Sequence, residues 1–431
     1  MPESHPEKPS RIEPVAIEQM PEAIVDAIAD VVAESTALGE ALHPLTAASL
    51  ADLVRIMNAY YSNLIEGHDT RPRDIERALQ NDFDSNPERR DLQREAVAHV
   101  RVQHAIDRLA AAGELPEPAS TAFLESLHRD FYRYASADAL RVRGRDATEY
   151  AMIPGRLRNE AKQDNVVGRH QPPSSPSVEA FMHYFASRYR FAELGRAGRI
   201  AAIAAAHHRL NYIHPFPDGN GRVSRLMSHA MGHAAGIGAH GLWSISRGLA
   251  RGLESPMEYM HMMDATDAPR ASDVDGRGNL SRRALIDFTL WFLRVCLDQI
   301  RFMRELFELE SLERRLRLYV LRDEQLGPQA AELLVHAAAR GEFERGEVAR
   351  ITGLTGTVGT TRARRRHRGG SARIVDAERP RLASLSGVER IGALSPALLT
   401  APRSVRSGTG ASVSAPFRLH VARRNGRNFR L

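Results

Sequence analysis

One stretch near the middle of the chain constrains the fold more than any other, because it ends one helix and starts another within a few residues. It occupies residues 214–225 and reads His-Pro-Phe-Pro-Asp-Gly-Asn-Gly-Arg-Val-Ser-Arg. An Ala-rich segment at 199–212 precedes it and predicts a helix. Pro215 and Pro217 cannot continue that helix, because proline lacks an N–H and fixes φ. Apolar residues return at helical spacing after Asp218, so the sequence predicts helix, tight loop, helix.

The loop contains the residue types of an anion-binding site. Gly219, Asn220 and Gly221 fall at the predicted start of the second helix, where unpaired N–H groups and the helix dipole attract an anion. The glycines also allow a phosphate to approach the backbone closely. Arg222 and Arg225 lie three apart on one helical face, and we expect them to bind the outer phosphates of a nucleotide.

Two further residues of this stretch suggest chemistry. Asp218 offers the hard oxygen ligand that Mg²⁺ prefers, and His214 is the natural general base. A phosphate cradle, a metal ligand and a base so close together predict a phosphoryl-type transfer site. The alternative, a helix-capping loop with two surface arginines, explains each residue singly but not their combination.

The stretch resembles the motif of the Fic family, His-x-Phe-x-Asp/Glu-Gly-Asn-Gly-Arg-x-x-Arg, and every fixed position is filled. The resemblance implies a mainly α fold: a Fic-type helical core with a small β-hairpin flap, N-terminal inhibitory helices and an incomplete C-terminal helix-turn-helix. It also implies an adenylyltransferase that moves AMP from ATP, with Mg²⁺, to a Tyr, Ser or Thr hydroxyl of a target protein. His214 would deprotonate that hydroxyl. Other Fic proteins transfer UMP, phosphate or phosphocholine, and the motif excludes none of these donors.

A second, shorter resemblance lies in a helix predicted over 47–66. Its end reads Ser-Asn-Leu-Ile-Glu-Gly and resembles the Ser/Thr-x-x-x-Glu-Gly/Asn inhibitory motif of Fic proteins, with Ser62, Glu66 and Gly67 at the fixed positions. The resemblance implies that Glu66 pairs with Arg225 and competes with the γ-phosphate of ATP. The alternative is an ordinary glutamate near a helix end, where its charge opposes the dipole.

The helical pattern breaks at 152–173, where turn residues flank short extended segments and predict a β-hairpin. By resemblance this hairpin is the flap on which the target protein docks through strand addition, with Val166, Val167 and Gly168 at its centre. A structural loop without target contact is the alternative.

Other candidate ligands are weaker. Tyr259 lies where Fic proteins often place an aromatic residue against the nucleotide, although the next residue is Met where a second Tyr is common. His229 and His233 stand four apart on a predicted helix and suggest zinc, but no HExxH motif is present and the sequence shows no third ligand. We therefore interpret them, like His207 and His208, as helix histidines with hydrogen-bond partners inside the protein. The polar loop 267–280 lacks the Glu of a calcium loop.

Patterning predicts six segments. These are a disordered N-terminus at 1–15, an N-terminal helical region with the inhibitory helix at 16–113, the Fic catalytic core at 114–270, a helical extension at 280–340, a partial helix-turn-helix at 341–368 and a basic, disordered tail at 369–431. Periodicity is lost after about residue 357, and we hypothesise a change of reading frame there.

The charge distribution and the single cysteine limit the classes of function that are possible. Residues 357–431 hold 16 Arg, no Lys and 3 acidic residues, which leaves 43 basic and 50 acidic residues and a net charge of −7 for the rest. The basic tail alone makes the chain basic, so net charge is weak support for nucleic-acid binding. The single Cys296 excludes a disulfide framework, and no apolar run predicts a signal peptide or membrane span, so we expect a cytoplasmic protein.

Two alternatives to simple AMP transfer stay open, and the packing of one helix is open as well. Glu66 could position a water for the removal of AMP from a modified target. The helix-turn-helix could make the protein a DNA-binding regulator. A long amphipathic helix at 285–309 could pack on the core or form a homodimer.

Overall fold

The computed structural model describes residues 7–144, 148–164, 166–167, 170–322, 326–341 and 347–353. The chain divides into two compact units. The first comprises residues 1–42 and 50–307 and contains the stretch at 214–225; the second comprises residues 43–49 and 308–431. We describe each unit separately.

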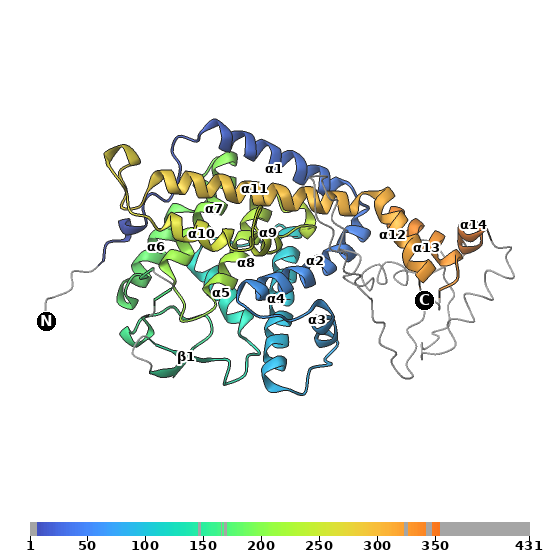
Figure 1. The fold of residues 1–431 in the computed structure, drawn as a ribbon, viewed down its shortest axis with the longest axis horizontal. Coiled ribbons are helices and arrows are strands. Elements are labelled where there is room, and N and C mark those ends of the chain that lie inside the picture. Colours follow the sequence, from blue (N-terminus) through green and yellow to red (C-terminus); the bar gives the residue numbers. More distant parts are fainter. Residues whose placement is uncertain are drawn as a thin grey trace, which may run out of the picture. The chain divides into compact units, whose positions relative to one another are not determined.

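The regular structure of the first unit is mainly helical, as the sequence predicts (Figure 1). Its helices are α1 (Glu22–Glu40), α3 (Pro72–Leu79), α4 (Pro87–Ala111), α5 (Thr121–Phe131), α6 (Val178–Arg188), α7 (Arg196–Ile213), α8 (Asn220–Ala234), α9 (Ile245–Arg251), α10 (Glu258–Thr266) and α11 (Arg282–Phe307). It also contains α2 (Pro44–Ile65) from residue 50 onward. Short 3₁₀ turns lie at Pro9–Ile12, Ala161–Gln163, Ser175–Ser177, Phe191–Glu193, Ala239–Gly241 and Asp273–Asp275. In the part of the chain that the structure describes, no helix combines the length and apolarity needed to cross a membrane.

Helix α7 is the centre of this unit. Its second half, from Ile200 to Ile213, is buried almost all round, and five alanines there allow neighbouring helices to pack closely. Helix α8 packs along α7, and α11 packs against both α7 and α1, which lies beside it in Figure 1. The loop between α7 and α8 is therefore held by the best-packed part of the protein.

The predicted helix boundaries agree with the structure to within a few residues. Helix α2 ends at Ile65, and Gly67 follows with a left-handed φ of +83°. The N–H of His68 bonds the carbonyl of Asn63 across that turn, which completes the glycine-dependent helix stop. Ser120 caps α5 by accepting a hydrogen bond from the Phe123 N–H at 3.3 Å.

The hairpin prediction placed the strands too late in the chain. The paired antiparallel strands are β1 (Arg141–Arg143) and β2 (Glu149–Ala151), with Val142 opposite Tyr150. Within the described part of 152–173 the structure gives one isolated bridge, between Val167 and His170. Both strands are only three residues long, and half of their residues are charged, so they are too short to show the apolar alternation that marks a strand.

The prediction of disorder at 1–15 is wrong for residues 7–15. Ile12 and Val15 are fully buried, and the Tyr189 hydroxyl donates to the Val15 carbonyl at 2.8 Å. The guanidinium of Arg209, inside α7, donates to the Pro14 carbonyl at 2.8 Å. Two apolar anchors in a polar segment are too few to produce a periodic signal, and tertiary contacts supply the order.

The second unit contains α12 (Leu309–Arg322), α13 (Gln329–Arg340) and α14 (Val348–Thr352). Leu316 and Leu334 are buried in its core. Thr46 adds a buried hydroxyl that donates to the Ala338 carbonyl at 3.0 Å. Of the predicted helix-turn-helix at 341–368 only Gly341 and residues 347–353 belong to the described part, and the basic tail lies outside it.

Candidate active site

The loop between α7 and α8 depends on two left-handed residues. His214 ends α7 with φ 51° and ψ 57°, and Gly219 caps the start of α8 with φ 77°. Between them, the Asn220 side chain bonds the backbone of Phe216 in both directions: Oδ1 accepts from its N–H at 2.9 Å and Nδ2 donates to its carbonyl at 2.8 Å. Phe216 is itself fully buried and stacks on the His128 ring with centroids 4.2 Å apart.

These contacts separate the roles of the Asn220 side chain and backbone. Both ends of the side-chain amide are hydrogen-bonded to the loop. Its backbone N–H remains in the first turn of α8, where N–H groups have no partner within the helix. The side chain therefore shapes the anion site, and the backbone provides it.

His214 stands at the mouth of this loop as a neutral imidazole. Burial, followed by the nearby Arg158 guanidinium, lowers the pKa of His214 to about 3. The backbone carbonyl of Asn211 also accepts a hydrogen bond from the His214 ring. Near neutral pH the ring is thus unprotonated, which is the state in which a general base begins its work.

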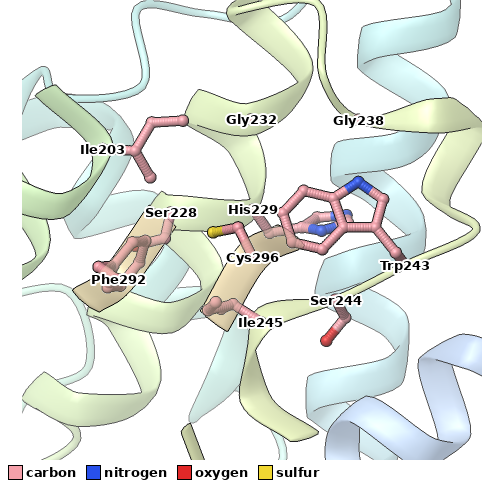
Figure 2. A pocket seen from close by; sticks show the side chains of 10 residues that line it. All are labelled: Ile203, Ser228, His229, Gly232, Gly238, Trp243, Ser244, Ile245, Phe292 and Cys296. Carbon is pink, nitrogen blue, oxygen red and sulfur yellow. The ribbon is translucent and has the colours of Figure 1, made fainter. Parts of the chain in front are cut away.

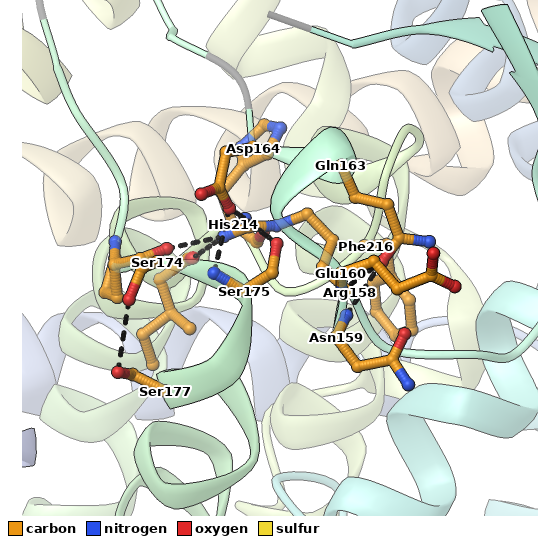
Figure 3. A network of polar contacts seen from close by, with 12 residues as sticks. Arg158, Asn159, Glu160, Gln163, Asp164, Ser174, Ser175, Ser177, His214 and Phe216 are labelled. Atoms are coloured by element: carbon orange, nitrogen blue, oxygen red, sulfur yellow. Dashed lines mark hydrogen bonds and ion pairs between the residues drawn. The ribbon is translucent and has the colours of Figure 1, made fainter. Parts of the chain in front are cut away.

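Arg158 binds the loop through its guanidinium, and nothing in the sequence marks it as a residue of the site. Its side chain is 1% exposed, and its Nε donates to the His214 carbonyl at 2.7 Å. Figure 3 shows this guanidinium at the centre of a polar network that reaches Asp164 and Ser175, each at 3.0 Å. It also donates to the carbonyl of Pro173 at 3.0 Å. One buried arginine therefore joins the segment 158–175 to the loop.

Asp218 presents its carboxylate at the edge of the loop. Its Oδ2 accepts a hydrogen bond from the Tyr132 hydroxyl at 2.9 Å, and its side chain is 53% exposed. Burial tends to raise the pKa of Asp218, but Arg222 and the Gly219 N–H hold it below the ordinary value. A Cβ at Gly219 would lie 2.7 Å from the Tyr132 ring, so this position also needs glycine for space. An ionised, partly exposed carboxylate fits the predicted Mg²⁺ ligand.

Arg225 is bound by the C-terminal end of α2. Its Nη2 donates to Glu66 Oε1 at 2.6 Å, and its Nε donates to Ser62 Oγ at 2.9 Å. The guanidinium is 1% exposed, while the Glu66 side chain is 32% exposed. The structure thus brings together the two predicted inhibitory residues and the last arginine of the motif.

Glu66 also lies directly against the start of α8. A Cβ at Gly221 would be 2.8 Å from Glu66 Oε1, so only glycine leaves room for this carboxylate. Burial tends to raise the pKa of Glu66, but Arg225 and Arg222 hold it below its ordinary value of 4.5. A negative charge therefore occupies the space over the helix N-terminus where a phosphate would bind.

Arg222 has partners that the sequence did not suggest. Its Nη2 donates to Glu95 Oε2 on α4 at 3.0 Å, and its Nη1 donates to the Tyr132 hydroxyl at 3.0 Å. The side chain is 5% exposed. Both arginines of α8 are consequently paired with carboxylates from other helices.

Tyr259 lies beneath the site rather than on its surface. It is 5% exposed, and its hydroxyl is 2.9 Å from Nε2 of the buried His207, whose other nitrogen is 2.9 Å from Ser228 Oγ. Its ring stacks on Trp291. The hydroxyl is also close enough to Arg225 to interact with its charge. Tyr259 therefore supports Arg225 from inside the core.

The histidines of α8 have a partner that the sequence could not reveal. His229 and His233 both approach Asp107 of α4, with Nε2 to Oδ1 distances of 2.6 and 3.0 Å. Asp107 is distant in the sequence, and no motif marks it. Asp107 is thus the hydrogen-bond partner inside the protein that we expected for both histidines, and it is also a third potential ligand that the sequence did not show.

A groove lies next to the loop, on the side of the short sheet. Its volume is about 250 Å³, and it is lined by Pro217, by Tyr150 and Ala151 of β2, and by residues of the segment 153–163. Val166 and Val167, from the predicted flap, are 50% and 40% exposed, and Gly168 lies outside the described residues.

Comparison with known protein families matches residues 119–231 to the Fic/DOC family. That range runs from just before α5 to the end of α8 and includes the whole loop. Residues 119–231 form a Fic/DOC domain. The Fic/DOC domain thus contributes His214, Asp218 and both arginines, while Glu66 comes from α2, outside the matched range.

Curated relatives of the Fic/DOC domain match over a short range. Protein adenylyltransferase Fic of Aedes aegypti is 37% identical over 70 residues, which is 16% of this chain and 14% of that protein. Its counterpart in Nematostella vectensis is 37% identical over 71 residues, 16% of this chain and 17% of that protein. The chain therefore spans only about a seventh of the length of the first relative.

A solved structure extends the likeness of the fold. The crystal structure of a Fic family protein from Desulfovibrio desulfuricans G20 aligns with a TM-score of 0.50 at 15% identity, over 80% of this chain and 88% of that chain. This agreement supports the Fic-type helical fold.

Proposed function

We propose that this chain is a protein adenylyltransferase, held in an inhibited state by Glu66, that transfers AMP from ATP to a hydroxyl of a target protein. The observation that carries the proposal is the 2.6 Å contact between Glu66 and Arg225 over Gly221. A carboxylate in that place would keep a competing anion away from Arg225 and from the start of α8. The short matches to proteins named adenylyltransferase support AMP as the transferred group.

ATP binding would use the first turn of α8. Backbone N–H groups at the helix N-terminus bind phosphate oxygens, and the dipole favours their charge. Arg225 is the residue that would bind the γ-phosphate after Glu66 leaves, because a guanidinium binds carboxylate and phosphate with the same geometry. Gly221 leaves that space open to either anion.

The transfer step needs a base and an in-line approach. His214, neutral because its pKa is about 3, would take the proton from the target hydroxyl, whose oxygen then attacks the α-phosphorus. A P–O bond forms to the target and the bond to pyrophosphate breaks. Asp218 would hold Mg²⁺, which supplies neutralisation of phosphate charge. Arg158 fixes the His214 carbonyl and so keeps the base in place.

The target protein would dock beside the loop. The groove next to Pro217 offers a mixed surface of apolar, polar and charged side chains, and Val166 and Val167 add exposed apolar ones. Pairing of an extended target segment with this region would bring its hydroxyl to His214.

Labelling with α-³²P-ATP and Mg²⁺ tests the proposal. The wild type, Glu66→Gly and Glu66→Gly/His214→Asn proteins would be compared for automodification; Asn is chosen because it tolerates the left-handed conformation of residue 214. We expect label only in Glu66→Gly. Asp69→Gly, at an exposed position three residues later, is the matched control and should stay unlabelled.

Two results would contradict the proposal. Equal labelling of Glu66→Gly and the double variant would remove His214 from the chemistry. Absence of label from every variant, with a target-rich lysate added, would exclude AMP transfer, and release of AMP from a modified protein would then be the activity to examine.

A further inference from the structure

Three potential ligand atoms converge between α4 and α8, outside the site described above. Nε2 of His229 and Nε2 of His233 lie 2.6 and 3.0 Å from Oδ1 of Asp107, and 3.3 Å from each other. All three side chains are less than 10% exposed. The proposed transfer mechanism uses none of them.

Hydrogen bonding alone leaves this cluster crowded. Both imidazoles point their Nε2 atoms at one carboxylate oxygen, and the two nitrogens approach each other at 3.3 Å. Each ring can donate only one proton to that oxygen, and the two hydrogens must then share a small space. A cation between the three atoms would accept one lone pair from each of them.

The distances suit a small transition-metal ion. Zinc binds imidazole nitrogen at about 2.0–2.1 Å, so ligand atoms around a tetrahedral ion lie about 3.3 Å apart. The nitrogen pair already has that separation, and Oδ1 would move outward by a fraction of an ångström. Two histidines four apart on one helical face are also the usual way in which a helix supplies two zinc ligands.

The carboxylate is held in the orientation that a ligand requires. Nε of Arg55, on α2, donates to the other oxygen of Asp107 at 2.7 Å, which leaves Oδ1 facing the histidines. The backbone seals the cluster from the other side: a Cβ at Gly241 would lie 3.0 Å from Oδ2, and one at Gly238 would overlap the His233 ring. Supporting contacts of this kind orient the ligands of metal sites.

His229 also has space to adjust. It borders a cavity of about 20 Å³ that Gly238, Trp243 and Ser244 help to line, as Figure 2 shows. That volume is enough for about one water molecule.

We propose that Asp107, His229 and His233 form a binding site for a transition-metal ion of the Zn²⁺ type, with water as a fourth ligand. The ion links α4 to α8 through its three protein ligands. The hydrogen bond from Arg55 to Asp107 connects α2 to the same site. Because His229 lies one turn after Arg225, the ion fixes the helix that carries the phosphate-binding arginines. The site is independent of the proposed AMP transfer.

Metal titration of the full chain, stripped with a chelator, tests this site. Co²⁺ is the probe, because its visible absorption reports tetrahedral nitrogen and oxygen ligation, and Zn²⁺ should displace it. We expect one Co²⁺ per chain and a rise in Tm on adding Zn²⁺. His229→Gln and His233→Gln should each weaken binding by roughly tenfold or more. His104→Gln, at an exposed position of the same helix as Asp107, should bind like the wild type.

A second measurement covers variants that fold poorly. X-ray absorption of the zinc-loaded wild type should show two imidazoles in the coordination shell. No absorption band with Co²⁺, or binding that both glutamine variants leave unchanged, would overturn the proposal. Imidazole ligation that His104→Gln removes would overturn it as well.

Discussion

Arg222 and Glu95 form an ion pair, with 3.0 Å between Nη2 and Oε2, that mirrors the pairing of Arg225 with Glu66. Burial tends to lower the pKa of Arg222, but Tyr132 and Glu95 raise it above its ordinary value. Each arginine of α8 is therefore neutralised by a carboxylate from a different helix, Glu66 at the end of α2 and Glu95 in α4. In the proposed function, an incoming triphosphate would have to compete with both.

Glu95→Gln should make the arginines more available to ATP. In the Glu66→Gly background we expect the apparent affinity for ATP to rise by roughly tenfold, because a charge-assisted hydrogen bond of about 1.5 kcal/mol no longer competes. The KM for ATP in the labelling assay measures this. Glu88→Gln, exposed at the start of the same helix, is the control. A KM that stays the same or rises would show that Glu95 does not restrain Arg222.

Ser62→Ala should release the inhibition only in part. The Ser62 hydroxyl accepts from Arg225 Nε at 2.9 Å, and the loss of such a bond weakens the arrangement by about 1 kcal/mol. Basal labelling should rise by roughly fivefold and stay well below that of Glu66→Gly. Ser126→Ala, on the unrelated α5, should change nothing. Labelling as strong as in Glu66→Gly would mean that Ser62, and not the carboxylate, is the main restraint.

Arg158→Gln should damage both stability and catalysis. The substitution leaves Asp164 without its cation and removes the donors to the carbonyls of His214 and Pro173. Loss of one partner of a buried pair destabilises by about 3–5 kcal/mol. Thermal unfolding measures the first effect. For the second, kcat of the Glu66→Gly protein should fall more than its KM for ATP changes; an unchanged kcat in the folded variant would contradict a positioning role.

The pH–rate profile should lack the inflection of an ordinary histidine. Burial and Arg158 lower the pKa of His214 to about 3, so the base stays neutral as the pH falls through 6.5. We expect kcat of Glu66→Gly to be constant from about pH 8 to about pH 5. Glu66 itself has a pKa below 4.5, so inhibition of the wild type should persist over the same range. A loss of kcat centred near pH 6.5 would show that His214 is exposed to solvent in the working enzyme.

Acid should destabilise the fold through its buried histidines. Burial lowers the pKa values of His99 and His207 to about 3, from ordinary values of 6.5. Below pH 6.5 the unfolded chain takes up protons at these positions and the folded chain does not. The free energy of unfolding therefore decreases as the pH is lowered. Each residue contributes a loss of up to about 2 kcal/mol by about pH 5. Urea unfolding at several pH values measures this, and a flat profile down to pH 5 would contradict it.

The sequence predicted the helices and the loop because both have local causes. Alanine and apolar spacing predict α7 and α8, and Pro215 and Pro217 predict the break between them. Gly67 predicted the end of α2 for the same reason, since a left-handed turn favours glycine.

The parts that sequence reasoning missed depend on tertiary contacts. Asp107 and Glu95 are single carboxylates on a helix full of charges, and nothing local separates them from solvated neighbours. Arg158 is one of many arginines in the sequence. Its structural role depends on the His214 carbonyl, which only the folded chain brings within hydrogen-bond distance. Strands β1 and β2 are too short and too charged to show alternation.

Glu66 is the first residue beyond the last turn of α2, so the proposed inhibitory carboxylate moves with the end of that helix. A helix end can open without unfolding of the core and without a hinge between domains, and here the opening breaks the contacts of the buried Ser62. Loss of one terminal turn would carry Ser62 and Glu66 away from Arg225 together, while the rest of α2 stays packed. Any partner that captures this frayed end would therefore act as an activator.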